Sequence, residues 1–449
     1  MQIEAVHRHI DTMQQQDLET LMQVVRQPSV SAQDLGIRQC GKLLVELLEG
    51  IGVSARLIET EGEPVVYGER MCGNPDAKTI LFYGHYDTQP AEPLDDWNTD
   101  PFEPVVKDGR IWGRGTADNK GQFLPHFFAV RSYLAVHGDL PVHVKFVLDG
   151  EEESGSPSMR GFVESHKEML KADLVYFADG PANANDQPEL MHGFRGMYSC
   201  HMILETAAHE NHSGKTGLLI PNPITEMMRL ITTMIDPTGH ITIDGFYDDV
   251  VAPTDFEWDL IDKIDYSPEK FAKTFGVDHI PYDKREYYYR FMFQPTLTIS
   301  TLMGGYMGKG SKTSVPNRAE LKFDMRLAWD QDPYDIEKKV KAHVAKFNPD
   351  IVVNTINRTP SSKTPVDLPV CKAVAEAASK YFDCVLIPTA GATCPDYVWT
   401  RILHTPSILM PYGNRDQDNH AANENLKLEN FYKGIHTSAE VIHCVSKIK

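Results

Sequence analysis

The chain has 449 residues, a formal net charge of −19 at pH 7, and a composition that is 41% hydrophobic and 24% charged. This length predicts two or three domains, and the acidic charge argues against nucleic acid or an anionic membrane as a partner. No apolar run approaches the roughly 20 residues that span a bilayer. The seven scattered cysteines form no Cys-x-x-Cys pair and the N-terminus lacks a signal-sequence pattern, so we expect a reducing, cytoplasmic location.

The first part of the sequence alternates between helical and extended patterns. Helices are predicted over residues 1–26, 39–48, 120–136 and 158–170. Strands are predicted over residues 54–58, 65–68, 79–83, 142–148 and 174–178, and Asp108-Gly109 predicts a hairpin turn. Nearly continuous apolar strands that alternate with helices indicate an α/β fold with a helix-covered, mainly parallel sheet.

The pattern changes from about Arg195. Strands are predicted over residues 197–204, 293–301 and 319–328, and helices over residues 224–235 and 333–347. The Tyr- and Asp-rich stretch 246–290 is expected to be irregular. A helix at 369–382, a buried strand at 406–410 and a helix at 426–446 follow. We therefore expect a separate α+β insertion, after which the chain returns to complete the first domain.

Residues of the types that bind metals follow several predicted strands. His85, the run Glu151-Glu152-Glu153 and Asp179 each come after an apolar strand, Asp118 follows the predicted hairpin, and His420 lies far downstream. Functional groups in an open α/β sheet collect at the carboxyl ends of the strands. Carboxylates gathered there would repel one another at a high desolvation cost, which a bound cation relieves. Histidine and carboxylate ligands suit zinc or manganese better than calcium.

Each of these signals is weak when taken singly. Asp118 could instead cap the helix that begins near Lys120, and a Glu-Glu pair is usually solvated. The joint pattern favours a metal site, because an ordinary structural role would have to be assumed separately for each of these residues. Asp87 could fix the tautomer of His85, and one glutamate of the pair could be the general base while the other binds metal.

Several motifs occur together in one order along the chain. They are Gly84-His85-Tyr86-Asp87, Gly113-Arg114-Gly115-x-x-Asp118-x-Lys120-Gly121 and Gly150-x-Glu152-Glu153-Ser154-Gly155-Ser156, with His420 far downstream. This set resembles the co-catalytic dinuclear-zinc metallopeptidases, which include carnosinases, carboxypeptidase G and acetylornithine deacetylase. The carnosinase-like dipeptidase branch is the most similar, and the resemblance spans nearly the whole chain.

The resemblance implies a role for each metal-type residue. Asp118 would bridge two zinc ions, with manganese or cobalt as alternatives. His85 and Asp179 would complete one metal site, and Glu153 and His420 the other. Asp87 would support His85, and Glu152 would be the base that takes a proton from the bridging water.

The resemblance also implies a domain arrangement. Residues 1–194 and 365–449 would form the catalytic domain, and residues 195–364 an inserted, ferredoxin-like lid and dimerisation domain. His212 would stabilise the oxyanion, typically in the partner subunit's site of a homodimer. Arg326 would pair with the substrate carboxylate, and Asn317 and Thr313 would lie near the substrate. A surface histidine and an ordinary strand arginine are the alternative interpretations of His212 and Arg326.

The implied activity is hydrolysis of the amide bond in a dipeptide or short peptide with a free C-terminal carboxylate. An N-acyl or N-carbamoyl amino-acid amidohydrolase would use the same residues and stays open as an alternative. A binding protein on an inactive hydrolase fold would have lost a ligand or the base, and none is missing. The sequence departs from the family at Glu210-Asn211, before His212, and in the loop around Cys394, so the substrate is not fixed by the motifs.

Overall fold

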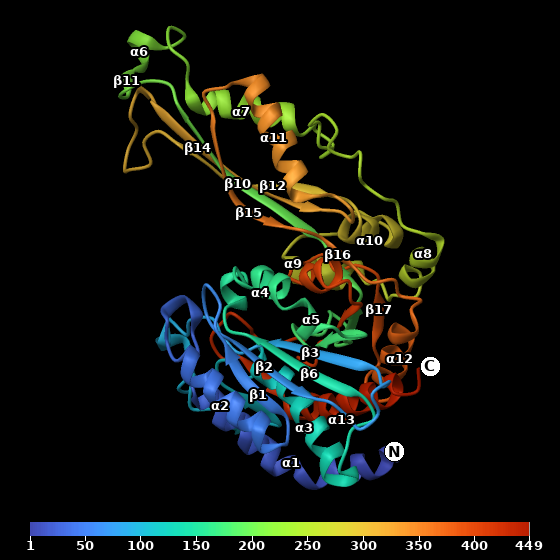
Figure 1. Cartoon of the computed structure of the whole chain (residues 1–449). Helices are drawn as coiled ribbons and strands as arrows, with labels where there is room; N and C mark the ends of the chain where they lie inside the picture. The colour runs from blue at the N-terminus through green and yellow to red at the C-terminus, as the bar shows by residue number, and fades with distance from the viewer. Residues whose placement is uncertain (449) are drawn as a thin grey trace.

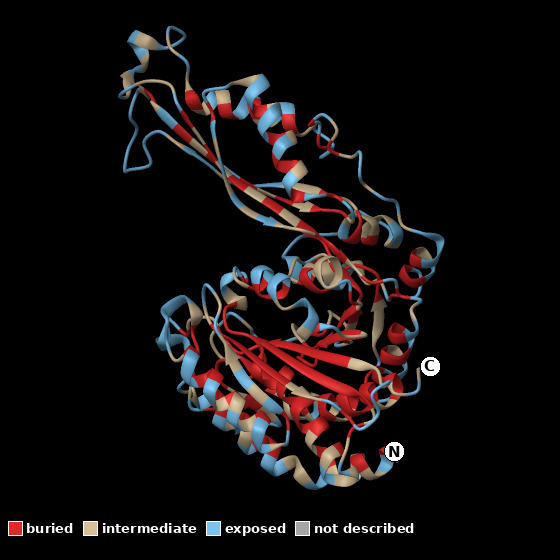
Figure 2. Cartoon of the chain, in the orientation of Figure 1, coloured by how far each residue is buried: buried red, intermediate tan, exposed pale blue. Residues whose placement is uncertain are grey.

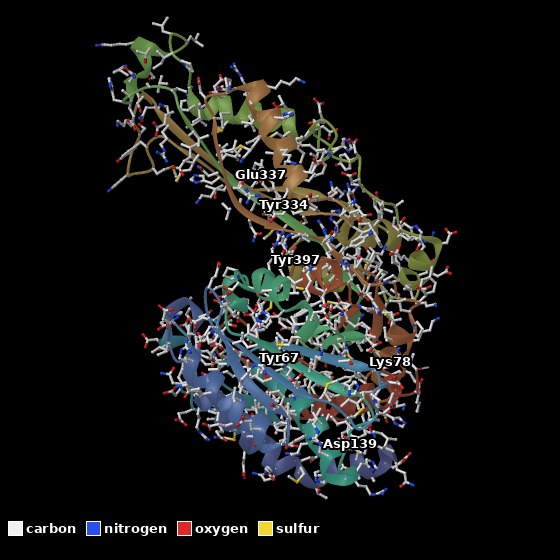
Figure 3. All side chains as sticks on the ribbon, viewed as in Figure 1. Tyr67, Lys78, Asp139, Tyr334, Glu337 and Tyr397 are labelled. Carbon is white, nitrogen blue, oxygen red and sulfur yellow. The ribbon has the colours of Figure 1, made fainter. Side chains whose placement is uncertain are left out.

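The computed structural model describes residues 1–448 and consists of two parts joined at one junction (Figure 1). The larger part contains an eight-stranded sheet between helices, and the smaller part contains a four-stranded sheet. At the junction, Arg160 donates a hydrogen bond to the Tyr334 hydroxyl across the two parts at 2.7 Å. Figure 3 labels Tyr334 and Tyr397 near this junction, on opposite sides of it.

The eight-stranded sheet is mixed and mainly parallel. Its order is β1-β2-β6-β3-β7-β18-β8-β17. The pairs β3/β6, β3/β7, β7/β18 and β8/β17 are parallel, whereas β1/β2, β2/β6 and β8/β18 are antiparallel. The strands are β1 Ser54–Ile58, β2 Val65–Arg70, β3 Thr79–His85, β6 His143–Asp149, β7 Leu174–Phe177, β8 Glu189–Met191, β17 Val385–Ile387 and β18 Ser407–Leu409. The predicted α/β class with a mainly parallel sheet is confirmed.

Helices cover both faces of this sheet. On β3, Ile80 and Phe82 belong to one buried cluster while Leu81 and Tyr83 belong to another, as the two-residue period of a strand requires. Figure 2 shows the middle strands as buried. One face packs on α1 Ile3–Arg26, α2 Ile37–Gly50, α3 Lys120–His137, α12 Pro369–Ala378 and α13 Leu428–Val445. The other packs on α4 Met159–Ser165, α5 Lys167–Leu170 and the short helix η4 Val398–Ile402.

The four-stranded sheet is antiparallel with the order β12-β14-β10-β15. Alternate residues of β10 and β14 are buried beneath two helices, so one face forms a second core. Its strands are β10 Gly196–Glu205, β12 Thr296–Gly304, β14 Arg318–Leu327 and β15 Val352–Thr359, and the helices are α7 Pro223–Met234 and α11 Pro333–Phe347. At the end of this sheet away from the junction lie β11 Asn211–His212, α6 Ser213–Thr216 and β13 Ser314–Val315 (Figure 1).

Short elements complete the fold. A three-stranded sheet joins β4 Val105–Lys107 and β5 Arg110–Trp112 to β19 Asn425–Lys427, and β9 Gly193–Phe194 pairs with β16 Ser362–Lys363. Three single-turn helices are η1 Ser31–Gln33, η2 Leu94–Asp96 and η3 Glu152–Ser154. No helix within residues 1–448 is long and apolar enough to cross a membrane. All seven cysteines lie in that range and are free thiols.

The prediction of an irregular stretch over 246–290 is wrong. It contains α8 Asp255–Ile261, α9 Pro268–Phe275 and α10 Lys284–Met292. Local caps begin two of them, because Thr254 accepts a hydrogen bond from the Glu257 amide and Asp283 accepts one from the Glu286 amide. The single helix predicted over 158–170 is instead broken at His166, whose backbone leaves the helical region, and β15 was not predicted.

Candidate active site

The predicted metal-type residues converge because three parallel strands end at one edge of the sheet. His85 is the last residue of β3 and lies opposite Asp149, the last residue of β6. Glu152 and Glu153 lie in the short helix that follows β6, and Asp179 comes two residues after β7. Because β6, β3 and β7 are neighbours, their carboxyl ends bring these side chains together.

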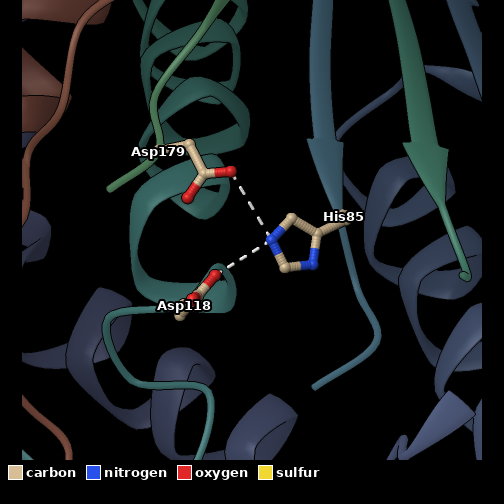
Figure 4. A group of neighbouring side chains, drawn as sticks. All are labelled: His85, Asp118 and Asp179. Carbon is tan, nitrogen blue, oxygen red and sulfur yellow. Dashed lines mark hydrogen bonds and ion pairs between the residues drawn. The ribbon is translucent and has the colours of Figure 1, made fainter. Parts of the chain in front are cut away.

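Two groups of ligand atoms share Asp118. His85 Nε2 lies 3.0 Å from Asp118 Oδ1 and 3.6 Å from Asp179 Oδ2 (Figure 4). His420 Nε2 lies 3.1 Å from Asp118 Oδ2 and 3.1 Å from Glu153 Oε2. In each group the three ligand atoms lie within 4.8 Å of one another. The two oxygens of Asp118 therefore face different groups, which is the geometry of a bridging carboxylate.

The electrostatics of both groups favour positive charge. Burial opposes protonation of His85, but hydrogen bonds with Asp118, Asp179 and Asp87 outweigh it and raise its pKa well above the ordinary value. Hydrogen bonds with Asp118 and Glu153 raise the pKa of His420 to about 10. Glu153 Oε1 is buried without a hydrogen-bond partner among the described residues. A free carboxylate oxygen, two imidazoles and a shared carboxylate form a donor set that fits divalent cations.

Asp87 supports both the histidine and the two glutamates. Its Oδ1 lies 3.3 Å from His85 Nδ1 and accepts a hydrogen bond from the Glu152 amide at 3.1 Å. Its Oδ2 accepts one from the Glu153 amide at 3.0 Å. The Gln89 side-chain amide donates to Glu153 Oε2 at 2.9 Å. Asp87 therefore lies where the sequence interpretation expected it, and it also fixes the turn that carries Glu152 and Glu153.

Glu152 lines a cavity beside the two groups. Burial raises the pKa of its carboxyl well above the ordinary value, and the nearby carboxylates of Asp179, Glu153 and Asp118 add to this while His85 opposes it. The cavity has a volume of about 440 Å³, which falls in the range of small-molecule sites. Its wall also includes Glu153, His420, Thr393, Cys394 and Asn357. Burial raises the pKa of the Cys394 thiol, so it is neutral at pH 7.

Comparisons with known proteins agree with this geometry. The model of peptidase family M20/M25/M40 matches residues 81–443. The chain belongs to this family. The resemblance noted from the motifs is thereby confirmed, and the protein is a metal-dependent hydrolase of peptide bonds.

Relatives of this peptidase include named dipeptidases. The Cys-Gly metallodipeptidase dug1 of Schizosaccharomyces pombe is 31% identical over 401 residues, which cover 86% of this chain and 83% of that protein. The Beta-Ala-His dipeptidase of Mus musculus is 27% identical over 460 residues, which cover 96% of this chain and 93% of that protein. The solved M20 metallo-carboxypeptidase Sso-CP2 of Sulfolobus solfataricus superimposes with a TM-score of 0.88 at 33% identity, covering 96% of this chain and 99% of that one.

The peptidase has one important residue to which the sequence interpretation gave no role. Glu424 is fully buried, and its carboxylate accepts hydrogen bonds from the amides of Gly115, Ala117 and Asp118 at 2.8–2.9 Å and pairs with Arg114 at 2.8 Å. It therefore fixes the loop that presents Asp118. Glu424 lies four residues after His420, and that proximity was the available signal.

The structure separates the predicted lid residues of the peptidase into two groups. His212 is exposed and lies opposite Ser314, next to Thr313, while Asn317 precedes β14. Arg326 lies near the other end of β14 and donates to Thr393 Oγ1 at 2.7 Å. At a rise of about 3.3 Å per residue, the strand from Arg318 to Arg326 spans about 26 Å. One chain therefore does not bring Arg326 and His212 to the same place.

Proposed function

We propose that this peptidase hydrolyses dipeptides and other short peptides that end in a free carboxylate. The observation that carries the proposal is the pair of three-ligand groups sharing Asp118, with Glu152 beside them in one cavity. The cavity is small enough to select short substrates. Relatives named as dipeptidases along most of the chain's length support the same substrate class.

The residues present fit two divalent cations. His85 and Asp179 would hold one with Asp118, and Glu153 and His420 would hold the other with Asp118. We propose zinc, although the same nitrogen and oxygen ligands accept manganese or cobalt. When bound, such ions lower the pKa of water and polarise a carbonyl group.

Glu152 is the proposed general base. Its raised pKa suits a carboxylate that takes a proton from the attacking water and then delivers it to the leaving amine. Asp87 holds the main chain of Glu152 and Glu153, and this restricts the base to one position beside the ligand groups. Arg326, at the junction beside Thr393, is proposed to pair with the substrate's terminal carboxylate.

A homodimer is proposed to complete the site. The roughly 26 Å between the two ends of β14 supports a model in which His212, Thr313 and Asn317 act in the partner subunit's site. Among the described residues β12 pairs only with β14, so its other edge is free. Ile299, Leu302 and Met303 on this edge strand are 39%, 39% and 49% exposed. A free edge with apolar side chains favours pairing with a second copy.

The partners expected with this function are small. We propose a cytoplasmic enzyme that acts on free peptides, since seven free thiols suit a reducing compartment. The net charge of −19 does not favour nucleic acid or an anionic membrane as a partner.

A substrate panel tests the proposed function. Purified protein loaded with zinc, manganese or cobalt is offered dipeptides, longer peptides, dipeptide amides, and N-acetyl and N-carbamoyl amino acids. We expect dipeptides with a free carboxylate to give the highest kcat/KM. Faster hydrolysis of N-acyl or N-carbamoyl amino acids would assign the protein to the amidohydrolases instead. Release of amino acids is measured by chromatography, with chelator-treated protein as the control.

A further inference from the structure

Arg195 is a buried arginine at the junction whose guanidinium contacts no carboxylate. It lies between β9 and β10 and is 4% exposed. Its Nη1 donates to the Phe291 carbonyl at 2.8 Å, and its Nη2 donates to Thr296 Oγ1 at 3.3 Å. Among the described residues its hydrogen-bond partners are carbonyl and hydroxyl oxygens only. A buried charge without an opposite charge is costly, so such an arginine requires an explanation.

Two threonines link Arg195 to Arg326. Thr296 Oγ1 accepts a hydrogen bond from Arg195 Nη2 and another from the Arg326 amide, each at 3.3 Å. Thr393 Oγ1 accepts one from Arg326 Nη1 at 2.7 Å and donates to the Arg195 carbonyl at 2.9 Å. Thr393 also lines the cavity that contains Glu152. Arg195 is therefore connected to the cavity wall through the same residues that hold Arg326.

The groups around Arg195 and Arg326 leave an excess of positive charge. Asp324 Oδ2 lies 3.9 Å from Arg326 Nε and its side chain is 33% exposed, so it offsets only part of the charge. The carbonyls of Arg290 and Phe291 belong to the last turn of α10, and a helix C-terminus carries about half a negative charge. Burial and the charge of Arg326 lower the pKa of Arg195 to about 10, which still leaves it protonated at neutral pH. An anion bound at Arg326 would relieve this imbalance.

We propose that Arg195 is a positioning residue for the substrate's C-terminal carboxylate and acts through Arg326 and Thr393. The proposal rests on the proposed function, which supplies a substrate with that carboxylate. The Arg195 guanidinium holds the Thr296 hydroxyl that also accepts from the Arg326 amide, while the Arg195 backbone carbonyl accepts from the Thr393 hydroxyl. The charge of the guanidinium raises the positive potential at that end of the cavity. It does not touch the reacting atoms, so its removal weakens carboxylate recognition more than it slows chemistry.

The alternative is that Arg195 only anchors the end of α10. The two roles differ in one measurable quantity, the ratio of kcat/KM for a dipeptide to kcat/KM for the same dipeptide with a C-terminal amide. An anchoring role changes both substrates alike and leaves the ratio unchanged. Recognition of the carboxylate through Arg326 changes the dipeptide and spares the amide.

We expect Arg195→Met to lower this ratio about tenfold, mainly through a higher KM for the dipeptide, with kcat changed less. Arg195→Lys retains the charge and is expected to recover part of the ratio. Arg401→Met is the matched control, because Arg401 also lies at the junction, donates to the Ser361 carbonyl at 2.6 Å and stacks over Trp329. Its ratio is expected to stay at the wild-type value.

An Arg195→Met protein whose ratio equals that of the wild type overturns the proposal. If Arg195→Met does not fold, Thr296→Val carries the same test, because it removes the hydroxyl shared by the two arginines and retains the side-chain shape. An unchanged ratio in Thr296→Val then overturns the proposal. A wild-type protein that cleaves dipeptides no better than their amides contradicts the proposed function itself, so the two failures are distinguishable.

Discussion

Replacing Glu152 with glutamine is expected to reduce kcat by about 10²–10⁴-fold while the metal content stays at the wild-type level. The amide retains the shape of the side chain and cannot accept a proton from water. Glu152 is not part of either ligand group. Asp87 holds the backbone amide of Glu152, so this hydrogen bond does not depend on the Glu152 side chain. The measurement is the initial rate on a cleaved dipeptide, together with elemental analysis of the same sample.

The neighbouring substitution Glu153→Gln is the matched control. Glu153 Oε2 lies 3.1 Å from His420 Nε2 and belongs to a ligand group, so this change is expected to lower metal occupancy. The contrast between the two adjacent glutamates separates a base from a ligand. If Glu152→Gln retains more than about a tenth of the wild-type rate, the general-base role is wrong, since loss of such a base costs at least about a hundredfold.

Inactive Glu152→Gln and inactive His212→Ala proteins, refolded together, are expected to form heterodimers that regain part of the wild-type activity. The short strand β11, which ends at His212, lies at the far end of the four-stranded sheet from the junction (Figure 1). If His212 donates a hydrogen bond to the oxyanion in the partner's site, its loss costs about 10²–10³-fold in kcat. In the mixed dimer, the His212→Ala subunit keeps its Glu152 and receives an intact His212 from its partner.

Activity is measured on heterodimers isolated with two different affinity tags. His209→Ala is the control, because His209 is an exposed histidine on the same segment and is expected to keep wild-type activity. Verified heterodimers that show no recovery would exclude action across the subunit interface. An inactive His209→Ala protein would show that the segment tolerates no change, and His212 would then lose its special assignment.

The sequence predicted the metal-type cluster well because of one physical rule. Parallel neighbouring strands end at the same edge, so His85, Glu153 and Asp179 could be placed together before the structure was known. Asp118 was grouped with them because it follows the predicted hairpin, and His420, far downstream, received its place in the ligand set from the motif resemblance. The structure adds that the two oxygens of Asp118 face opposite groups.

Other features depend on contacts between distant residues, which the sequence does not show. Glu424 holds the Asp118 loop by accepting hydrogen bonds from backbone amides, and backbone donors leave no side-chain pattern in the sequence. The separation of Arg326 from His212 follows from the length of β14, which is visible only once both residues are placed along one strand. The helices in 246–292 were missed because tyrosines and aspartates obscured their apolar period. Their caps at Thr254 and Asp283 are local in the sequence and were the signal that could have found them.

The central claim is that two metal ions bind with Asp118 between them. Its most direct measurement is elemental analysis of the reconstituted protein, compared with Asp118→Ala. We predict two ions per wild-type chain, because five ligand residues exceed what one tetrahedral site requires. We predict that Asp118→Ala loses ions from both groups, since each uses one Asp118 oxygen. A fully active wild-type protein with one ion or fewer per chain would contradict the account.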